Sequence, residues 1–468
     1  MIDDEYENDY IKQQIEDFEN SAFGKFFKNK KLQEQELIYL NNKALDIINE
    51  EDLFEIMSLI PQPFIVNDKD DNLDVLSVIY NKFLENTEIP LSLPIFGFFS
   101  FLSAYCVKNN ITYTLPLSDD KSPCDTWITV LAPSGSAKTF SIGQIKKVIP
   151  TDLDGKKLIE QNFTKPNGPA KFIEELSNLP KTKDGKSQYG FWIEDEVAQM
   201  FKQIEQIGSP LSEIKEYLLK AYDHEKLSRK SKKETIETDN LVLTLLFINT
   251  FESYVNNISQ ESMTDGLMRR FNLVYTEKDE RRDFTKFALY DIKKIRDQTL
   301  EKKVSDFFYS IEGDKSYTFS KDCYYLYTKY FKIFWDRKYK NILTNKENFY
   351  RTYMMQSWKF AVFYHLILKR EGTEIQGDCL IFGMKISLLF ANSMKKFFDF
   401  KIRKNIPDKK IEKIKTDLTK YIDFLENNPE ATLREFSRKY TLKKANAIAV
   451  LKSLQCANIQ HKLIEELE

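Results

Sequence analysis

The sequence predicts an α/β protein with a parallel sheet at its centre and helices over much of the remaining chain. Apolar runs of strand length alternate in its middle part with segments that have the helical spacing of apolar residues. Gly and Pro number only 14 each, against 36 Phe and 24 Tyr, which favours a helix-rich protein over a turn-rich β architecture. The 468 residues, 42% hydrophobic and 30% charged, suffice for two to four globular domains.

Charge is distributed unevenly along the chain, although the formal net charge is only −2. The first 20 residues hold eight acidic groups and one basic group, whereas 401–460 hold 14 basic and seven acidic groups. We therefore expect an acidic, helical amino-terminal region over 1–60 and a basic surface near the carboxyl end. The sequence Pro61-Gln-Pro63 marks the boundary of the acidic region.

Cysteine usage and the amino terminus favour a cytoplasmic protein. The five cysteines lie far apart, without a CxxC pair or a nearby His pair, so neither a zinc site nor a disulfide framework is expected. The acidic amino terminus does not have the pattern of a signal peptide. The uncharged stretch from Ile89 to Val107 contains Pro90 and Pro94, which leaves it too short for a membrane span. We predict a buried core helix there and no membrane association.

The stretch from Thr126 to Pro150 has the order of a phosphate-binding loop. An apolar strand (Trp127–Leu131) leads through a turn of small residues to Lys138-Thr139 and a helix, so that backbone N–H groups at a helix start face an anion. Gly is expected at the first and sixth positions, where this chain has Ala132 and Ala137. An ordinary strand-to-helix turn is the alternative. The predicted phosphate ligands are Ser134, Gly135, Ser136, Ala137, Lys138 and Thr139.

A second apolar run, Tyr189–Ile193, ends in Glu194-Asp195-Glu196. A carboxylate at the end of such a strand can hold Mg²⁺ together with Thr139, and the next carboxylate can polarise an attacking water. We assign these roles to Asp195 and Glu196. Strands often end in acidic residues without any such role, which is the alternative. Asp195 lies 57 residues after Lys138, which leaves room for a crossover between parallel strands.

Two later segments add candidate site residues. The run 241–251 ends in Asn249-Thr250, and Asn249 is our first choice for a γ-phosphate sensor, unless it caps a helix. Arg270 precedes a further strand, Phe271–Tyr275, and could reach phosphate within its own subunit or across a subunit interface. A structural ion pair is the alternative for Arg270. The basic segment before 241, with Lys226, Arg229, Lys230, Lys232 and Lys233, predicts a loop or hairpin.

These elements together resemble a family of primase–helicase-like P-loop proteins of phages, plasmids and integrated elements. The matching segments are APSGSAKT, FWIEDE, LLKAYDHEKLSRK and DGLMRRF, in the family's order, over roughly residues 75–400. His224 stands where the family usually has Gly. The resemblance implies a RecA-like ATPase core over 61–285 and a helical region over 286–405. It also implies ATP and Mg²⁺ as cofactors, a homo-oligomer, and an association with DNA replication.

The end of the chain, 406–468, resembles a winged helix. Segments 416–428, 431–440 and 442–459 have the spacing of three helices, and the third starts with Lys443, Lys444 and Asn446. The same shape also serves protein docking. Two hypotheses follow: a DNA-associated, helicase-like ATPase that works with a primase or another replication protein, or a nucleotide-binding regulatory or scaffold protein with little hydrolysis.

Overall fold

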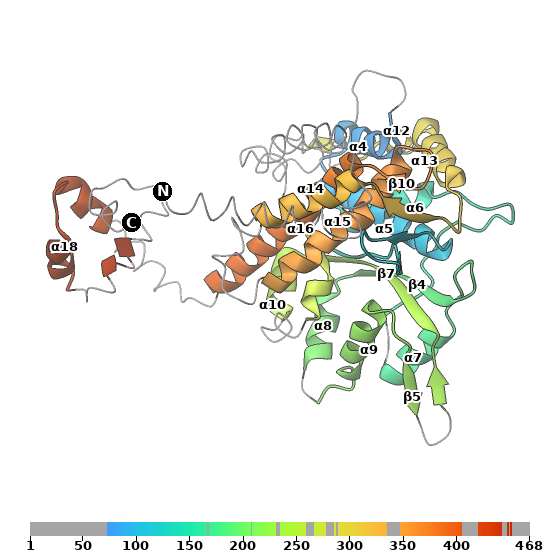
Figure 1. The fold of residues 1–468 in the computed structure, drawn as a ribbon, viewed down its shortest axis with the longest axis horizontal. Helices are drawn as coiled ribbons and strands as arrows, with labels where there is room; N and C mark the ends of the chain where they lie inside the picture. The colour runs from blue at the N-terminus through green and yellow to red at the C-terminus, as the bar shows by residue number, and fades with distance from the viewer. Residues whose placement is uncertain are drawn as a thin grey trace, which may run out of the picture. The chain divides into compact units, whose positions relative to one another are not determined.

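The structure is a computed structural model, and it divides the chain at Phe397 into two compact units. Figure 1 shows the fold in ribbon form. The residues that the structure describes are 73–165, 168–206, 208–230, 235–258, 266–277, 285–286, 289–334, 347–404, 420–441, 447–448 and 450–451. The predicted acidic helices over 1–60 lie outside these residues.

The first unit contains the predicted parallel sheet. Its strand order is β4-β7-β3-β8, and every neighbouring pair is parallel. All six residues of β3 are buried, as expected where helices cover both faces of a sheet. The bounds are Trp127–Ala132 for β3, Ser187–Asp195 for β4, Asn240–Thr250 for β7 and Asn272–Tyr275 for β8. The α/β class and the four strands that the sequence indicates are therefore confirmed.

The strand register aligns the carboxyl ends of the four strands at one edge of the sheet. Ala132 pairs with Thr250, Leu131 with Tyr275, and Asp195 with Ile248. Strand β7 lies between β3 and β4, although it follows both of them in the chain. The segments that leave β3, β4 and β7 therefore emerge side by side.

Helices cover both faces of this sheet (Figure 1). Helix α5 packs on β3, β4 and β7 and against α6, while α9 and α10 also contact β7. Figure 1 draws α5 on one side of the sheet and α8 and α9 on the other. The bounds are Ser92–Lys108 for α5, Lys138–Val148 for α6, Pro169–Ser177 for α7, Ala198–Glu205 for α8, Glu213–Tyr222 for α9 and Phe251–Asn257 for α10.

Helix α5 contains most of the uncharged stretch from Ile89 to Val107. Its residues from Ser92 to Val107 are all buried inside the first unit. Among the described residues, no helix is both long and apolar enough to cross a membrane.

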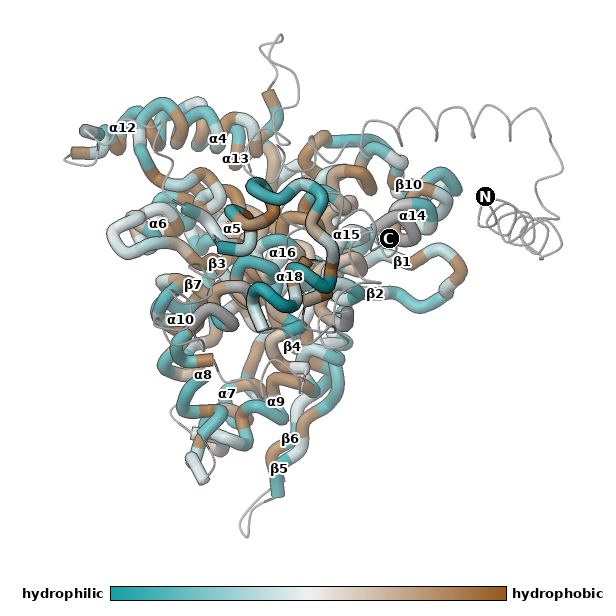
Figure 2. The backbone as a smooth tube through the Cα atoms, turned by 90° about the vertical axis from the view of Figure 1, so that its left-hand side faces the viewer, coloured by the Kyte–Doolittle hydropathy of each residue, from teal (hydrophilic) through white to brown (hydrophobic). Residues whose placement is uncertain are grey.

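Three helices outside the sheet pack on one another near α6. Helix α4 contacts α12 and α13, and α13 also contacts α6. Asp74 caps α4 by accepting hydrogen bonds from the backbone N–H groups of Leu76 (2.8 Å) and Ser77 (3.0 Å). Figure 2 shows hydrophobic and hydrophilic residues alternating along α4 and α13, as expected of helices with one buried side. The bounds are Val75–Asn86 for α4, Ile292–Ile295 for α12 and Gln298–Ser310 for α13.

A second sheet has the order β10-β9-β1-β2. The segment 109–125 forms a hairpin, with β1 and β2 antiparallel, and β9 adds to β1 in parallel. Strands β9 and β10 come from the segment 286–405, for which the sequence indicates helices only, so this sheet joins it to 61–285. The bounds are Thr112–Thr114 for β1, Lys121–Pro123 for β2, Ser316–Phe319 for β9 and Glu374–Ile375 for β10.

Long helices make up most of the rest of the first unit. They are α14 (Lys321–Phe334), α15 (Glu347–Ile367) and the start of α16 (Gly377–Lys404). Helices α15 and α16 cross closely at Gly383, where an added Cβ would lie 2.0 Å from the backbone oxygen of Ser357. The basic segment, for which the sequence predicts a loop or hairpin, contains the hairpin of β5 (Ser228–Lys230) and β6 (Thr235–Glu237). Lys232 and Lys233 lie outside the described residues.

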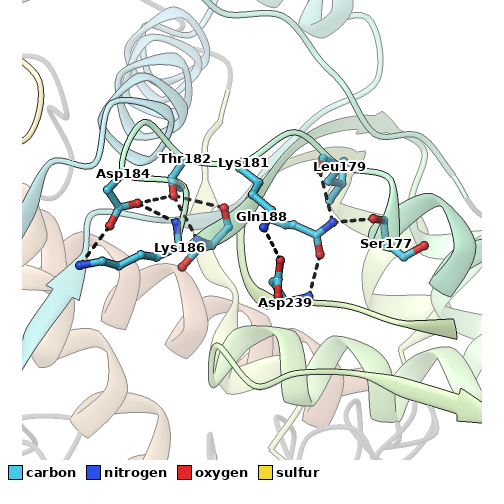
Figure 3. Close-up of polar contacts among 9 residues, drawn as sticks. Ser177, Leu179, Lys181, Thr182, Asp184, Lys186, Gln188 and Asp239 are labelled. Atoms are coloured by element: carbon cyan, nitrogen blue, oxygen red, sulfur yellow. Dashed lines mark hydrogen bonds and ion pairs between the residues drawn. The ribbon is translucent and has the colours of Figure 1, made fainter.

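Polar contacts fix the amino ends of β4 and β7, at the edge away from the loop that follows β3 (Figure 3). The Gln188 amide donates to the backbone oxygen of Ser177 at 2.6 Å and accepts from the N–H of Asp239 at 2.9 Å. The Asp239 carboxylate also pairs with Lys181 at 2.8 Å. These bonds hold β7 in register beside β4.

The second unit contains helical residues at 420–427 and α18 (Leu433–Lys439). Thr432 and Glu435 form a capping box at the start of α18. A small core of Leu425, Phe436, Ala447 and Leu451 joins three successive segments. The first two predicted helices are therefore present, whereas Lys443, Lys444 and Asn446 lie outside the described residues.

Candidate functional site

The loop after β3 turns sharply before it enters α6. Gly135 has φ +73°, and Ala137 lies in the left-handed region at φ +51°, ψ 38°. A left-handed residue with a side chain is strained, which explains why the motif asks for Gly at the sixth position. Ala132 continues β3 and is absent from the residues with positive φ, so its methyl group adds no backbone strain.

The loop is closed by two bonds to one carbonyl. The Pro133 oxygen accepts from the Ser136 hydroxyl at 2.8 Å and from the Lys138 amine at 3.0 Å. Ser134 and Gly135 are exposed at its tip, and a Cβ built on Gly135 would meet nothing within 4 Å. The start of α6 is therefore open to solvent on the side of the loop, as an anion-binding helix end must be.

Lys138 faces several carboxylates at the carboxyl edge of the sheet. Burial lowers the pKa of its amine, while the charges of Asp195, Glu196 and Glu252 oppose this change. This edge of the sheet therefore carries both the positive charge of Lys138 and the negative charges of three carboxylates.

Thr139 and Asp195 meet across β7. The Thr139 hydroxyl donates to Asp195 Oδ2 at 2.5 Å, although 56 residues separate them in the chain. Hydroxyl and carboxylate oxygens are ligands that Mg²⁺ prefers, and both side chains are exposed. The described residues hold no group of three or more His, Cys, Asp or Glu arranged as a metal site. The pair fits Mg²⁺ carried by phosphate oxygens, which needs only one or two protein ligands.

Glu196 follows Asp195 in a strained backbone conformation. Its φ is +56°, and its N–H is held by Asp195 Oδ1 and the Ile248 carbonyl, both at 2.9 Å. Its side chain is exposed at the same edge as Thr139. Left-handed residues with side chains persist only where surrounding contacts fix them, and they cluster at functional sites.

Asn249 is engaged in helix capping. Its side chain is 1% exposed, and its Oδ1 accepts from the N–H of Ala198, the first residue of α8, at 3.0 Å. Its Nδ2 donates to the Thr250 carbonyl at 3.0 Å. The alternative of a cap is therefore observed, but on α8 rather than on the next helix, α10. Asn249 thereby ties β7 to the segment after Asp195.

Arg270 lies at the opposite edge of the sheet from Lys138. It ends the 3₁₀ helix η3 (Met268–Arg270) just before β8, whose Asn272 pairs with Ile128 near the start of β3. The rise from there to Ala132 is on the order of 13 Å, well beyond the reach of an Arg side chain. Arg270 pairs with Asp223 at 2.8 Å, donates to the Gly266 carbonyl at 2.9 Å and covers the Tyr222 ring. The structure therefore shows the alternative of an ion pair, and does not bring Arg270 to the phosphate loop of its own chain.

Two charged groups were not identified from the sequence: Glu252 near the site and Asp125 at the opposite edge of the sheet. Glu252 lies in the first turn of α10, two residues after the end of β7. An acidic residue just after a central strand is a signal that could have identified it as a candidate site residue. Asp125, directly before β3, is buried and accepts a hydrogen bond from Lys359 of α15 at 2.9 Å. His224, with φ +58° where the resembling family usually has Gly, lies 3.4 Å from the same carboxylate. No local pattern links Asp125 to Lys359, 234 residues away.

The chain was also compared with known proteins. No family model matches it, and a search of the curated proteins found no significant match.

Proposed function

We propose that this chain is a Mg²⁺-dependent P-loop ATPase with a RecA-like core. The observation that carries the proposal is the Thr139–Asp195 hydrogen bond, because it joins the two halves of the predicted metal site across an intervening strand. Further support comes from the exposed loop, from Lys138 beside it, and from the position of the site at the carboxyl edge of a parallel sheet.

The roles of the residues follow from their positions. The backbone N–H groups of 134–139 would cradle the phosphates, and Lys138 would leave Pro133 to neutralise the β- and γ-phosphates. Thr139 and Asp195 would hold Mg²⁺, which when bound supplies positive charge to the transferred phosphoryl group. Glu196 would accept the proton of the attacking water. Arg270 would act only in a neighbouring subunit of a homo-oligomer.

Association with DNA is the less direct part of the proposal. It rests on the resemblance to primase–helicase-like proteins and on the basic surface of the second unit. Arg434, Arg438 and Lys439 of α18 are exposed there. Such a chain would act with a primase or another replication protein, on single-stranded or forked DNA, in the cytoplasm.

The second candidate is a nucleotide-binding regulatory protein with little hydrolysis. Asn249 and Arg270, which were expected to assist hydrolysis, are both engaged elsewhere. Ala137 strains the loop, and this also favours slow turnover over fast turnover.

Steady-state ATP hydrolysis with and without single-stranded DNA tests the proposal. We expect Glu196→Gln to lower kcat by about 10²–10⁴-fold with nucleotide affinity kept, as for loss of a general base. Lys138→Ala should abolish nucleotide binding, whereas Lys146→Ala, an exposed lysine on the same helix, should change neither quantity. Tight binding without turnover in the wild type would favour the regulatory candidate. Absence of nucleotide binding would contradict both.

Binding to DNA is tested separately on the full chain. Arg434→Ala and Arg438→Ala should each weaken binding without regard to sequence and lower the salt slope by about one. Arg351→Ala on α15 serves as the matched control. An unchanged affinity and slope in both α18 variants would remove the second unit from the DNA-binding proposal.

A further inference from the structure

Helix α8 begins without a cap from its own sequence. Val197, directly before its first residue, has an apolar side chain and makes no capping hydrogen bond. Helices usually have Ser, Thr, Asp or Asn at this position, and the side-chain oxygen accepts from a free backbone N–H. Here the oxygen comes from another strand, because Asn249 Oδ1 accepts from the N–H of Ala198, 51 residues away in the chain. The start of α8 is therefore fixed by β7.

The turn between β4 and α8 contains Glu196 and is attached to β7 on both sides of that residue. Glu196 has φ +56°, a conformation that a residue with a side chain keeps only where surrounding contacts fix it. On one side, its own N–H donates to Asp195 Oδ1 and to the Ile248 carbonyl, both at 2.9 Å. On the other side, the N–H of Ala198 donates to Asn249 Oδ1 at 3.0 Å. Consecutive residues of β7 thus hold the turn.

Both polar atoms of the Asn249 amide bind backbone groups. Oδ1 accepts from Ala198, and Nδ2 donates to the Thr250 carbonyl at 3.0 Å. The residue is 1% exposed, whereas Ser134 and Gly135 at the tip of the loop are exposed. In this arrangement the amide does not face a phosphate on the loop. An effect of Asn249 on hydrolysis must therefore pass through the backbone that it binds.

We propose that Asn249 is a positioning residue, which directs the Glu196 carboxylate by fixing the turn in which Glu196 lies. The inference rests on the proposed function, because it requires Glu196 to accept the proton of the attacking water. A general base acts only within hydrogen-bond distance of that proton, and a displacement of about 1 Å can cost about 10²-fold in rate. Nucleotide binding depends on the loop and Lys138, and neither bond of the Asn249 amide goes to them.

Asn249→Leu and Gln188→Met are matched variants. Gln188 is also a buried amide between β4 and β7, and its bonds to Ser177 and Asp239 lie at the amino ends of these strands (Figure 3). Each change replaces the amide with an apolar side chain of similar size, so urea denaturation should show similar losses of stability. Only Asn249→Leu should lower kcat for ATP hydrolysis, by about 10- to 100-fold, with KM for ATP unchanged.

Two further measurements test whether the effect passes through Glu196. In the Glu196→Gln background, Asn249→Leu should lower kcat by less than about twofold, because the base that it positions is already lost. Hydrogen exchange of the segment 194–199 should become faster in Asn249→Leu but not in Gln188→Met. Asn249→Ala removes the same oxygen without adding apolar bulk. It should reproduce both results, and it replaces the leucine variant if that variant does not fold.

The possible outcomes separate this inference from the ATPase proposal. An unchanged kcat in both Asn249 variants, or an equal loss of kcat in Gln188→Met, would overturn the inference while the ATPase proposal stands. A full additional loss in the Glu196→Gln background would also overturn it, since Asn249 would then act independently of Glu196. Absence of ATP hydrolysis by the wild type would overturn both.

Discussion

Ala137 and Ala132 occupy the two glycine positions of the loop, and their backbones differ. A left-handed alanine carries a strain of about 1–2 kcal/mol that glycine does not. We predict that Ala137→Gly raises the free energy of unfolding of the first unit by up to about 1 kcal/mol, because relief of strain exceeds the added chain entropy. Urea denaturation measures this quantity.

The matched control is Ala132→Gly. Its backbone is strand-like and buried, so glycine there should lower the free energy of unfolding by about 0.5–1 kcal/mol. A loss of stability in both variants would show that the left-handed turn at Ala137 is not strained.

At the scale of residues, sequence reasoning located the loop, Thr139 and Asp195, because strand, turn and helix leave a local pattern. The structure brings Thr139 and Asp195 together. The sequence could not show that Asn249 would cap α8, or that Arg270 would lie at the edge of the sheet opposite the loop. Both outcomes depend on strand register, which the sequence of one strand does not contain.

At the scale of elements, the crossing of α15 and α16 depends on Gly383. A methyl group there would collide with the backbone of Ser357, which cannot move as a side chain end can. We predict that Gly383→Ala lowers the unfolding free energy by at least about 2 kcal/mol, because the helices must separate. Thermal and chemical denaturation of the purified chain would measure the loss.

Gly143→Ala on α6 is the control, since a Cβ at that position meets nothing within 4 Å. It should stabilise the helix by about 0.5–1 kcal/mol. Equal effects at Gly143 and Gly383 would contradict the close crossing.

Prediction of elements succeeded where they were long or patterned. The parallel strands and the buried helix within the stretch 89–107 carry apolar runs. Strands β9 and β10, of four and two residues, are too short for a period to be visible. They exist because β1 offers an edge with which to pair, a non-local cause.

At the scale of the whole molecule, the Lys359–Asp125 ion pair fixes helix α15 to the start of β3. Side-chain exposures of 11% and 2% place the pair inside the first unit. We predict that Lys359→Met lowers the free energy of unfolding by about 3–5 kcal/mol, since Asp125 would be left as an uncompensated buried charge. Lys171→Met, which breaks an exposed pair with Glu174, should cost less than about 0.5 kcal/mol. Similar losses in the two variants would contradict the role of the buried pair.

The same pair predicts how stability depends on pH. Burial raises the pKa of the Asp125 carboxyl, but the charges of Lys359 and His224 outweigh burial, so the pKa lies below its usual value. Burial lowers the pKa of Lys359, and Asp125 reverses this, so that pKa lies above its usual value. The contribution of Asp125 is lost as the pH falls below about 4, and that of Lys359 as the pH rises above about 10.5.

Chemical denaturation across the pH range measures this dependence. The double variant Asp125→Asn/Lys359→Met should have a shallower decline at both extremes than the wild type. Parallel curves for the two proteins would exclude the pair as the source.

The placement of β7 has a consequence for the order in which the protein is made. During synthesis, β3 and β4 leave the ribosome before β7, which must then be inserted between them. In the folded protein β7 keeps the ends of β3 and β4 two strand spacings apart, about 10 Å, and Thr139 meets Asp195 at that separation. This arrangement cannot form until residues 240–250 have been synthesised. A nascent chain therefore brings Thr139 and Asp195, the proposed Mg²⁺ ligands, together late and in one step, so that incomplete chains would lack this pair.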